Sequence, residues 1–165
     1  KEAAQGQVCH AANDNDLAQV VVSGHREAVE RAFEIAKTKG AKRALLLPVS
    51  APFHCELMAP AARVMAEALD DVEINEPAVP VVANVIASDV SDPAAIRSLL
   101  VQQITGSVRW RECVAWMAAK GVTEAWEIGA GKALSGMIRR IAPEMATRAI
   151  GTPEDVKAAV EALNG

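Results

Sequence analysis

Apolar residues occur in short runs that alternate with segments of helical spacing. Residues 19–23 are a β-branched run closed by Gly24, and residues 27–39 then place apolar side chains three and four positions apart. The same alternation continues along the chain. It predicts strands at 19–23, 44–49, 79–85, 125–128 and 148–150, and helices at 27–39, 60–69, 93–104, 111–120, 132–141 and from 153 onward.

Helix-start signals support this assignment. Asp92 and Pro93 provide an N-cap and a first-position proline, and Thr152 and Pro153 provide the same pair for the last helix. Residues 79–85 are apolar on both alternating faces, which predicts a buried parallel strand. Because strands alternate with helices, the sequence predicts an α/β fold in which helices cover a sheet.

The composition is that of a globular chain. Of 165 residues, 51% are hydrophobic and 23% charged, with a net charge of −4, enough for one domain with a core. The acidic balance argues against nucleic acid or an anionic membrane as partner. Neither a signal peptide nor an apolar run of about 20 residues is expected. Three scattered cysteines predict neither a disulfide framework nor a zinc site, so a cytoplasmic location is expected.

His54 is the main candidate for chemistry. It follows a predicted strand, two positions after Pro52 and before a helix, where α/β folds place catalytic groups. Imidazole is suited to proton transfer near neutral pH. The alternative is a packed or capping histidine, because the neighbourhood supplies no nucleophile. Ser50 is too close along the chain, and Cys55 is expected to be buried.

A glycine turn at residues 127–134 is the second candidate. A turn of this kind between strand and helix can present first-turn amides to an anion. Neither nucleotide motif fits, since Leu134 replaces the third glycine of GxGxxG and Ala133 the Ser/Thr of a P-loop. The turn therefore either packs a helix on a strand or binds phosphate directly through residues 129–132.

Other motifs are absent or weak. The Gly-x-Ser-x-Gly elbow of a serine nucleophile occurs nowhere in the chain. The histidines share no helical face, so no metal site is predicted. Two basic clusters are read as solvated faces, with docking of a partner as the alternative. These clusters are Lys37, Lys39, Lys42 and Arg43, and Arg139 with Arg140.

Taken in order, seven segments resemble the malonyl-CoA:acyl carrier protein transacylases of bacterial type II fatty-acid synthesis. They are residues 19–25, 41–50, 52–54, 79–84, 96–103, 108–110 and 127–132. Family members are about twice as long, so the resemblance covers their C-terminal half. It implies part of a ferredoxin-like small subdomain at residues 1–47 and part of an α/β-hydrolase-like parallel-sheet core at residues 48–165.

The resemblance also implies a mechanism. In the family, an elbow serine attacks the malonyl thioester, a histidine accepts its proton, and malonyl passes to the phosphopantetheine thiol of acyl carrier protein. The matching histidine is His54, oriented by the backbone carbonyl of Gln103, so replacing the Gln103 side chain should matter less than replacing His54. Phe53 matches a residue that favours malonyl over methylmalonyl. Asn13 and Asn15 match asparagines near the CoA or pantetheine channel.

The family's serine elbow, its carboxylate-binding arginine and its oxyanion glutamine have no counterpart in this sequence. The chain alone is therefore expected to be inactive and to require the missing N-terminal half of the same enzyme. Expected partners are malonyl-CoA, as substrate rather than cofactor, and acyl carrier protein. Two alternatives remain, an acyltransferase domain of a polyketide synthase and a non-catalytic α/β module that binds carrier protein or CoA.

Overall fold

The computed structural model describes residues 1–164 and has a mixed α/β architecture. Its strands form three two-stranded sheets, β1 with β2, β3 with β4 and β5 with β6, within the described chain. The predicted α/β class is confirmed. The elements are β1 (Cys9–Asp16), β2 (Gln19–Gly24), α1 (Arg26–Thr38), a 3-10 turn η1 (Glu56–Met58), α2 (Ala59–Asp70), β3 (Val81–Ala83), β4 (Ser88–Val90), α3 (Pro93–Thr105), α4 (Trp110–Ala119), β5 (Glu124–Ile128), α5 (Ala133–Ile141), β6 (Ala146–Ile150) and α6 (Pro153–Asn164).

The chain divides into two compact units. The first contains residues 1–15 and 19–110, and the second contains residues 16–18 together with the chain from residue 111 onward. The division into residues 1–47 and 48–165 that the sequence indicated stays a prediction.

In the first unit, α1 packs beside β2, and Ala28 of this helix is fully buried. The start of α1 is fixed by two reciprocal bonds. His25 donates its backbone N–H to the Val8 carbonyl, and Val8 N–H donates to His25 Nδ1 at 3.0 Å. A Cβ at Gly24 would lie 2.0 Å from the Val8 oxygen, so this close approach requires glycine.

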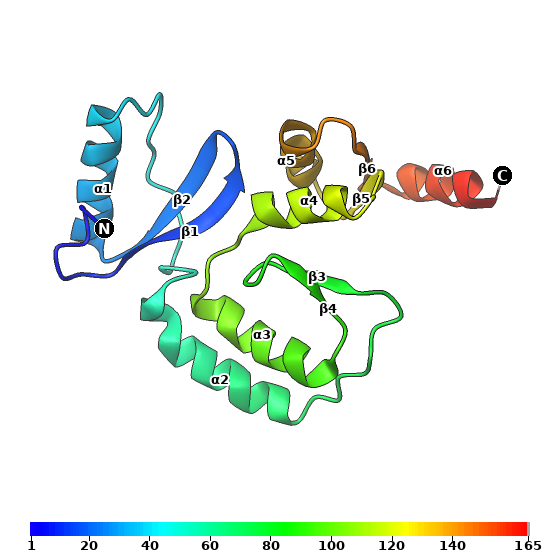
Figure 1. Cartoon of the computed structure of the whole chain (residues 1–165), viewed down its shortest axis with the longest axis horizontal. Helices are drawn as coiled ribbons and strands as arrows, with labels where there is room; N and C mark the ends of the chain where they lie inside the picture. Colours follow the sequence, from blue (N-terminus) through cyan, green and yellow to red (C-terminus); the bar gives the residue numbers. More distant parts are fainter. Residues whose placement is uncertain (165) are drawn as a thin grey trace. The chain divides into compact units, whose positions relative to one another are not determined.

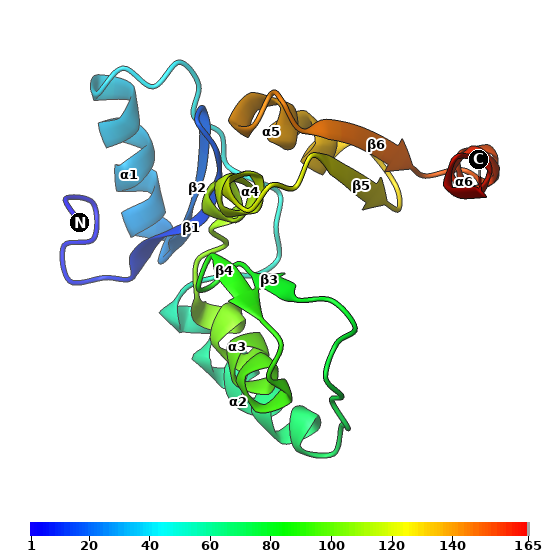
Figure 2. The same ribbon diagram turned by 45° about the vertical axis from the view of Figure 1, so that its right-hand side comes forward.

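The same unit contains the helix pair that supports the His54 loop. Helices α2 and α3 lie side by side in both views (Figures 1 and 2) and make many contacts. Asp92 caps α3 by accepting a hydrogen bond from Ala95 N–H at 2.7 Å, as the sequence predicted. The guanidinium of Arg97 in α3 donates to the Val72 carbonyl just after α2, at 2.6 Å. This bond ties the chain at the end of α2 to α3.

The second unit is built on a parallel strand pair. β5 and β6 pair in register from Glu124 opposite Ala146 to Ile128 opposite Ile150, with α5 as the connection between them. The buried core of this unit includes Val114, Ile138 and Met145. Because parallel strands require a crossover, the strand–helix–strand pattern of the sequence already indicated this topology.

The predicted helices are all confirmed within one or two residues, as are the strands at 19–23, 125–128 and 148–150. The capping signal of the last helix is confirmed as well. Asp155 N–H donates to Thr152 Oγ1 at 3.2 Å, and the Asp155 carboxylate accepts from the Thr152 and Gly151 amides. This reciprocal arrangement is a capping box.

Two strand predictions are wrong. Residues 44–49 form no strand, and Leu45, Leu46, Leu47 and Val49 are 52–62% exposed. Residues 79–85 contribute only β3, which pairs antiparallel with β4 and exposes 44% of Val81, instead of a buried parallel strand. An apolar run predicts that its side chains are buried. A strand also needs a neighbouring strand for its hydrogen bonds, and the described chain provides none for residues 44–49.

Strands β1 and β4 were not predicted. β1 contains Asn, Asp, His and Ala and lacks the β-branched residues that mark strands in a sequence. β4 is only three residues long. Both exist because a neighbouring strand pairs with them, and propensity alone does not report such pairing.

Candidate functional site

His54 lies in a tightly held loop before η1. Its backbone φ is +59°, in the left-handed region that non-glycine residues rarely adopt. The next residue, Cys55, is fully buried, and its thiol donates to the Pro52 carbonyl at 3.1 Å. Such backbone strain persists only where the surroundings hold it, and it is frequent at functional sites. The loop therefore presents the half-buried imidazole in one defined orientation.

The His54 ring contacts the backbone of Gln103 in α3. His54 Nδ1 lies 3.0 Å from the Gln103 carbonyl oxygen. A carbonyl only accepts hydrogen bonds, so Nδ1 carries a proton in this arrangement, and in the neutral ring Nε2 then keeps its lone pair. The imidazole is thus set in the tautomer of a general base. The catalytic role of His54 and of the Gln103 carbonyl stays a prediction.

The other predicted site residues lie in the same unit. Phe53 directly precedes His54, and its side chain is 46% exposed. Asn13 and Asn15 lie on β1 and are half-buried. Asn13 forms a parallel bridge with Val108, a residue that follows α3. Their contact with a substrate stays a prediction.

His10, which the sequence left as an isolated residue, forms an ion pair in the structure. Its Nε2 lies 3.8 Å from Glu56 Oε1; the His10 side chain is partly exposed and that of Glu56 is exposed. Glu56 is the first residue of η1, two positions after His54. The pair therefore links β1 to the start of η1, directly after the His54 loop. Since 46 residues separate the partners, the sequence held no signal for it.

The glycine turn after β5 is filled by a side chain of the protein itself. The Glu127 carboxylate accepts hydrogen bonds from Leu134 N–H at 3.0 Å and from Ser135 N–H at 2.7 Å. Hydrogen bonding by Ser135, together with the Leu134 amide, holds the Glu127 pKa below its usual range. The first-turn amides of α5 are thus occupied by an internal anion. This arrangement opposes the phosphate-binding alternative and favours a packing role for residues 129–132.

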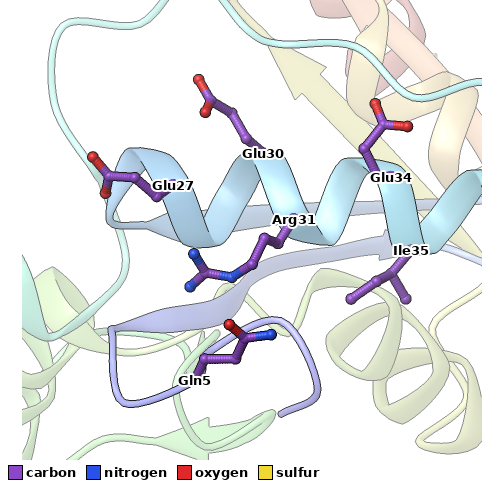
Figure 3. Close-up of a pocket in the computed structure, with 6 residues that line it drawn as sticks. All are labelled: Gln5, Glu27, Glu30, Arg31, Glu34 and Ile35. Carbon is purple, nitrogen blue, oxygen red and sulfur yellow. The ribbon is translucent and has the colours of Figure 1, made fainter.

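A surface hollow lies between α1 and the N-terminal turn (Figure 3). Arg31 and Ile35 point toward the side where Gln5 lies, whereas Glu30 and Glu34 project from the other side of the helix. The Arg31 guanidinium donates to the carbonyls of Ala3 and Ala4 and to the Gln7 side chain. These bonds tie the N-terminal turn to α1, so Arg31 has a structural role at this hollow.

Members of both basic clusters are engaged in ion pairs. Lys37 pairs with Glu34 at 3.0 Å, and Arg140 donates through Nε and Nη2 to the buried Asp16 carboxylate at 2.9 and 2.6 Å. Docking of a partner on these clusters stays a prediction.

Residues 1–164 contain no group of three or more His, Cys, Asp or Glu side chains placed to hold a metal ion. No helix in that range is long and apolar enough to cross a membrane.

The chain is similar to proteins of known function. It is 47% identical over 161 residues to the malonyl CoA-acyl carrier protein transacylase of Escherichia coli K12, an alignment that covers 98% of the chain and 52% of that protein. No family model matches. The crystal structure of an acyl-carrier-protein S-malonyltransferase from Bartonella henselae superposes with a TM-score of 0.94 at 51% identity, over 99% of this chain and 52% of that one.

A third relative was solved as a complex. It is a malonyl-transacylase bound to its type II PKS acyl-carrier protein, with a TM-score of 0.93 at 42% identity, over 98% of this chain and 52% of that one. The fold is thus the one found in solved malonyltransferases. The chain belongs to the malonyl CoA-acyl carrier protein transacylase family, and it spans about half the length of the curated relatives it matches.

Proposed function

We propose that this chain supplies the general base of a malonyl-CoA:acyl carrier protein transacylase. The observation that carries the proposal is the 3.0 Å contact between His54 Nδ1 and the Gln103 carbonyl, on a chain 47% identical to such an enzyme. A histidine whose Nδ1–H is bound to a fixed acceptor directs the lone pair of Nε2 outward. This is the logic of a catalytic triad with a main-chain carbonyl as third member.

The proposed reaction has two halves. Nε2 of His54 accepts the proton of a serine hydroxyl, the serine oxygen attacks the thioester carbonyl, and the carbon–sulfur bond breaks. The proton then passes to the leaving CoA thiolate. In the second half, the carrier-protein thiol gives its proton to Nε2 and attacks the malonyl ester. The carbon–oxygen bond breaks, and the serine oxygen regains the proton.

The nucleophilic serine is outside this sequence, which lacks the Gly-x-Ser-x-Gly elbow. We therefore include in the proposal a partner polypeptide, namely the remaining half of such an enzyme, and infer that this chain alone does not turn over. Malonyl-CoA is the donor substrate, acyl carrier protein is the acceptor, and a cytoplasmic setting belongs to the same proposal.

Phe53 supplies a basis for substrate choice. Its side chain is 46% exposed directly beside His54 in the chain, where a bulky ring would crowd an α-methyl group on the substrate. Discrimination of one methyl group in a pocket is worth about 1–3 kcal/mol. Malonyl transfer is accordingly expected to exceed methylmalonyl transfer.

The test uses a joined protein, in which this chain is fused to the part of the Escherichia coli relative outside the aligned 161 residues. In the joined protein, His54→Ala should lower malonyl transfer to carrier protein by about 10²–10⁴-fold, the range typical of general base catalysis. Gln102→Ala is the matched control, because the exposed Gln102 side chain lies in the same unit and bonds only Ser98 within its own helix, at 2.9 Å. Near-normal transfer by the folded His54→Ala protein would contradict the proposal.

A further inference from the structure

The side-chain amide of Gln103 makes contacts that the proposed reaction does not use. Gln103 Nε2 donates to the Gly106 carbonyl at 3.0 Å and lies 3.4 Å from the Ser107 carbonyl. These two carbonyls follow one another directly after the end of α3. Gln103 therefore contacts His54 through its backbone oxygen and binds residues 106 and 107 through its side chain.

The segment that Gln103 grips is in turn bonded to strand β1. Val108 N–H donates to the Ala12 carbonyl at 2.8 Å, and Asp14 N–H donates to the Val108 carbonyl at 2.9 Å. Ser107 Oγ lies within hydrogen-bonding distance of the same Ala12 carbonyl, at 3.3 Å. Ala12 itself is only 2% exposed. Residues 107 and 108 are thus attached to a buried part of β1, on both sides of Asn13.

The turn out of α3 is also sterically confined. A Cβ at Gly106 would lie 2.7 Å from Val85 Cγ2 and 2.9 Å from the Gln102 carbonyl oxygen. The Gly106 amide donates to that same Gln102 carbonyl at 2.8 Å. The backbone at Gly106 therefore has little space to adopt another conformation.

We propose that the Gln103 side-chain amide is a positioning group for His54, separate from the Gln103 carbonyl that contacts the ring. The last carbonyls of a helix have no amide one turn further on, and helix ends fray. The direction of the Gln103 carbonyl therefore depends on what holds the chain just beyond it. By binding the Gly106 and Ser107 carbonyls, the amide fixes the last turn of α3 so that this oxygen faces Nδ1.

These two bonds of the Gln103 side-chain amide, called here the Gln103 amide clamp, also set the spacing between two parts of the predicted site. The segment that Gln103 holds is bonded to the residues flanking Asn13, while the Gln103 carbonyl holds His54. A displacement of residues 106–108 would therefore change the positions of Asn13 and His54 together. This inference rests on the proposed role of His54 as general base, but its test does not require acyl transfer.

The test is ¹⁵N NMR of the His54 ring in this chain, which reports whether the proton is on Nδ1 or Nε2. The unaltered chain should show mainly the Nδ1–H tautomer. In Gln103→Ala, the ratio of Nδ1–H to Nε2–H should fall by about fivefold or more, the effect of roughly one net hydrogen bond. Gln102→Ala is the matched control, because the exposed Gln102 side chain bonds only Ser98 within the same helix, at 2.9 Å. It should leave the ratio unchanged.

Gln103→Met covers the case in which the alanine variant does not fold. Methionine keeps the length of the side chain but cannot donate a hydrogen bond, so the same fall in the tautomer ratio is expected. An unchanged ratio in a folded Gln103 variant would overturn the inference, as would loss of the fold in both variants. An altered ratio in a joined protein that keeps full transfer activity would instead contradict the proposed function of His54.

Discussion

The Glu127 side chain occupies the backbone amides that the glycine turn after β5 could otherwise offer to an anion. The turn after β5 has the glycines and the following helix that an anion site needs, yet the two amides of α5 that such a ligand would bind already contact the Glu127 carboxylate. An acidic side chain at a helix N-terminus also interacts favourably with the helix dipole. The local sequence contains Glu127 but does not reveal that its side chain turns back onto the next helix.

Glu127→Gln should destabilise the chain in a pH-dependent manner. The pKa of Glu127 is lowered by its hydrogen bonds to Ser135 and Leu134, so its contribution is complete above the ordinary pKa of glutamate. That contribution is lost as the pH falls through the lowered pKa of the folded state. The urea midpoint of the variant should therefore lie below that of the unaltered chain at about pH 7, and the difference should shrink toward about pH 3.

Glu124→Gln is the control for that experiment. Glu124 lies on the same strand, but its carboxylate makes only a 3.8 Å exposed pair with Arg148, and exposed pairs contribute little. A difference for Glu127→Gln that is equally large at both pH values would show that the carboxylate charge is not responsible.

The candidate site was only partly predictable from individual residues. His54 stood out because a histidine between a proline and a helix start is a constrained imidazole, and its resemblance to a family motif named its role. Its contact with Gln103 spans 49 positions, so only the resemblance indicated it. The Gln103 amide clamp was not anticipated, because a glutamine in the last turn of a helix is ordinarily solvated.

Gly106→Ala tests the turn that ends α3. The added Cβ would meet Val85 Cγ2 at 2.7 Å and the Gln102 carbonyl at 2.9 Å, so the segment must shift. Overpacking of this kind typically destabilises by about 1–3 kcal/mol. Urea denaturation should show that loss, and the ¹⁵N spectrum should show a disturbed His54 tautomer ratio.

Gly136→Ala serves as the comparison for Gly106→Ala. Gly136 lies inside α5, and an added Cβ would meet Arg140 Nη1 at 3.9 Å, an ordinary contact. Alanine should be neutral or stabilising there by about 0.5–1 kcal/mol, since it restricts the unfolded chain. Equal effects of the two substitutions would contradict the steric account of Gly106.

Helices were predicted more accurately than strands for a physical reason. A helix satisfies its backbone hydrogen bonds within its own sequence, so spacing and caps such as Asp92 and Thr152 largely define it. A strand needs a second strand for the same bonds. Residues 44–49 have the composition of a strand but no strand to pair with. Strand β1 lacks that composition but pairs with β2.

The chain exposes a run of apolar side chains, and it is only about half as long as its relatives. Leu45, Leu46, Leu47 and Val49 are more than half exposed in succession, a contiguous arrangement that usually marks an interaction surface. The chain covers 52% of the Escherichia coli relative. Both facts agree with the proposal that the rest of such an enzyme is the partner of this chain.

Hydrogen exchange of residues 44–49 tests that agreement directly. In the chain alone, the amides of this segment should exchange rapidly, because the segment is exposed and forms no strand. In the joined protein, the sequence pattern predicts a paired strand, so these amides should exchange at least about tenfold more slowly. Residues 153–164, an already formed helix, provide the internal reference. Fast exchange of residues 44–49 in a joined protein that transfers malonyl would show that the exposed run is not where the two halves meet. Slow exchange together with activity would show that strand formation there accompanies assembly of the site.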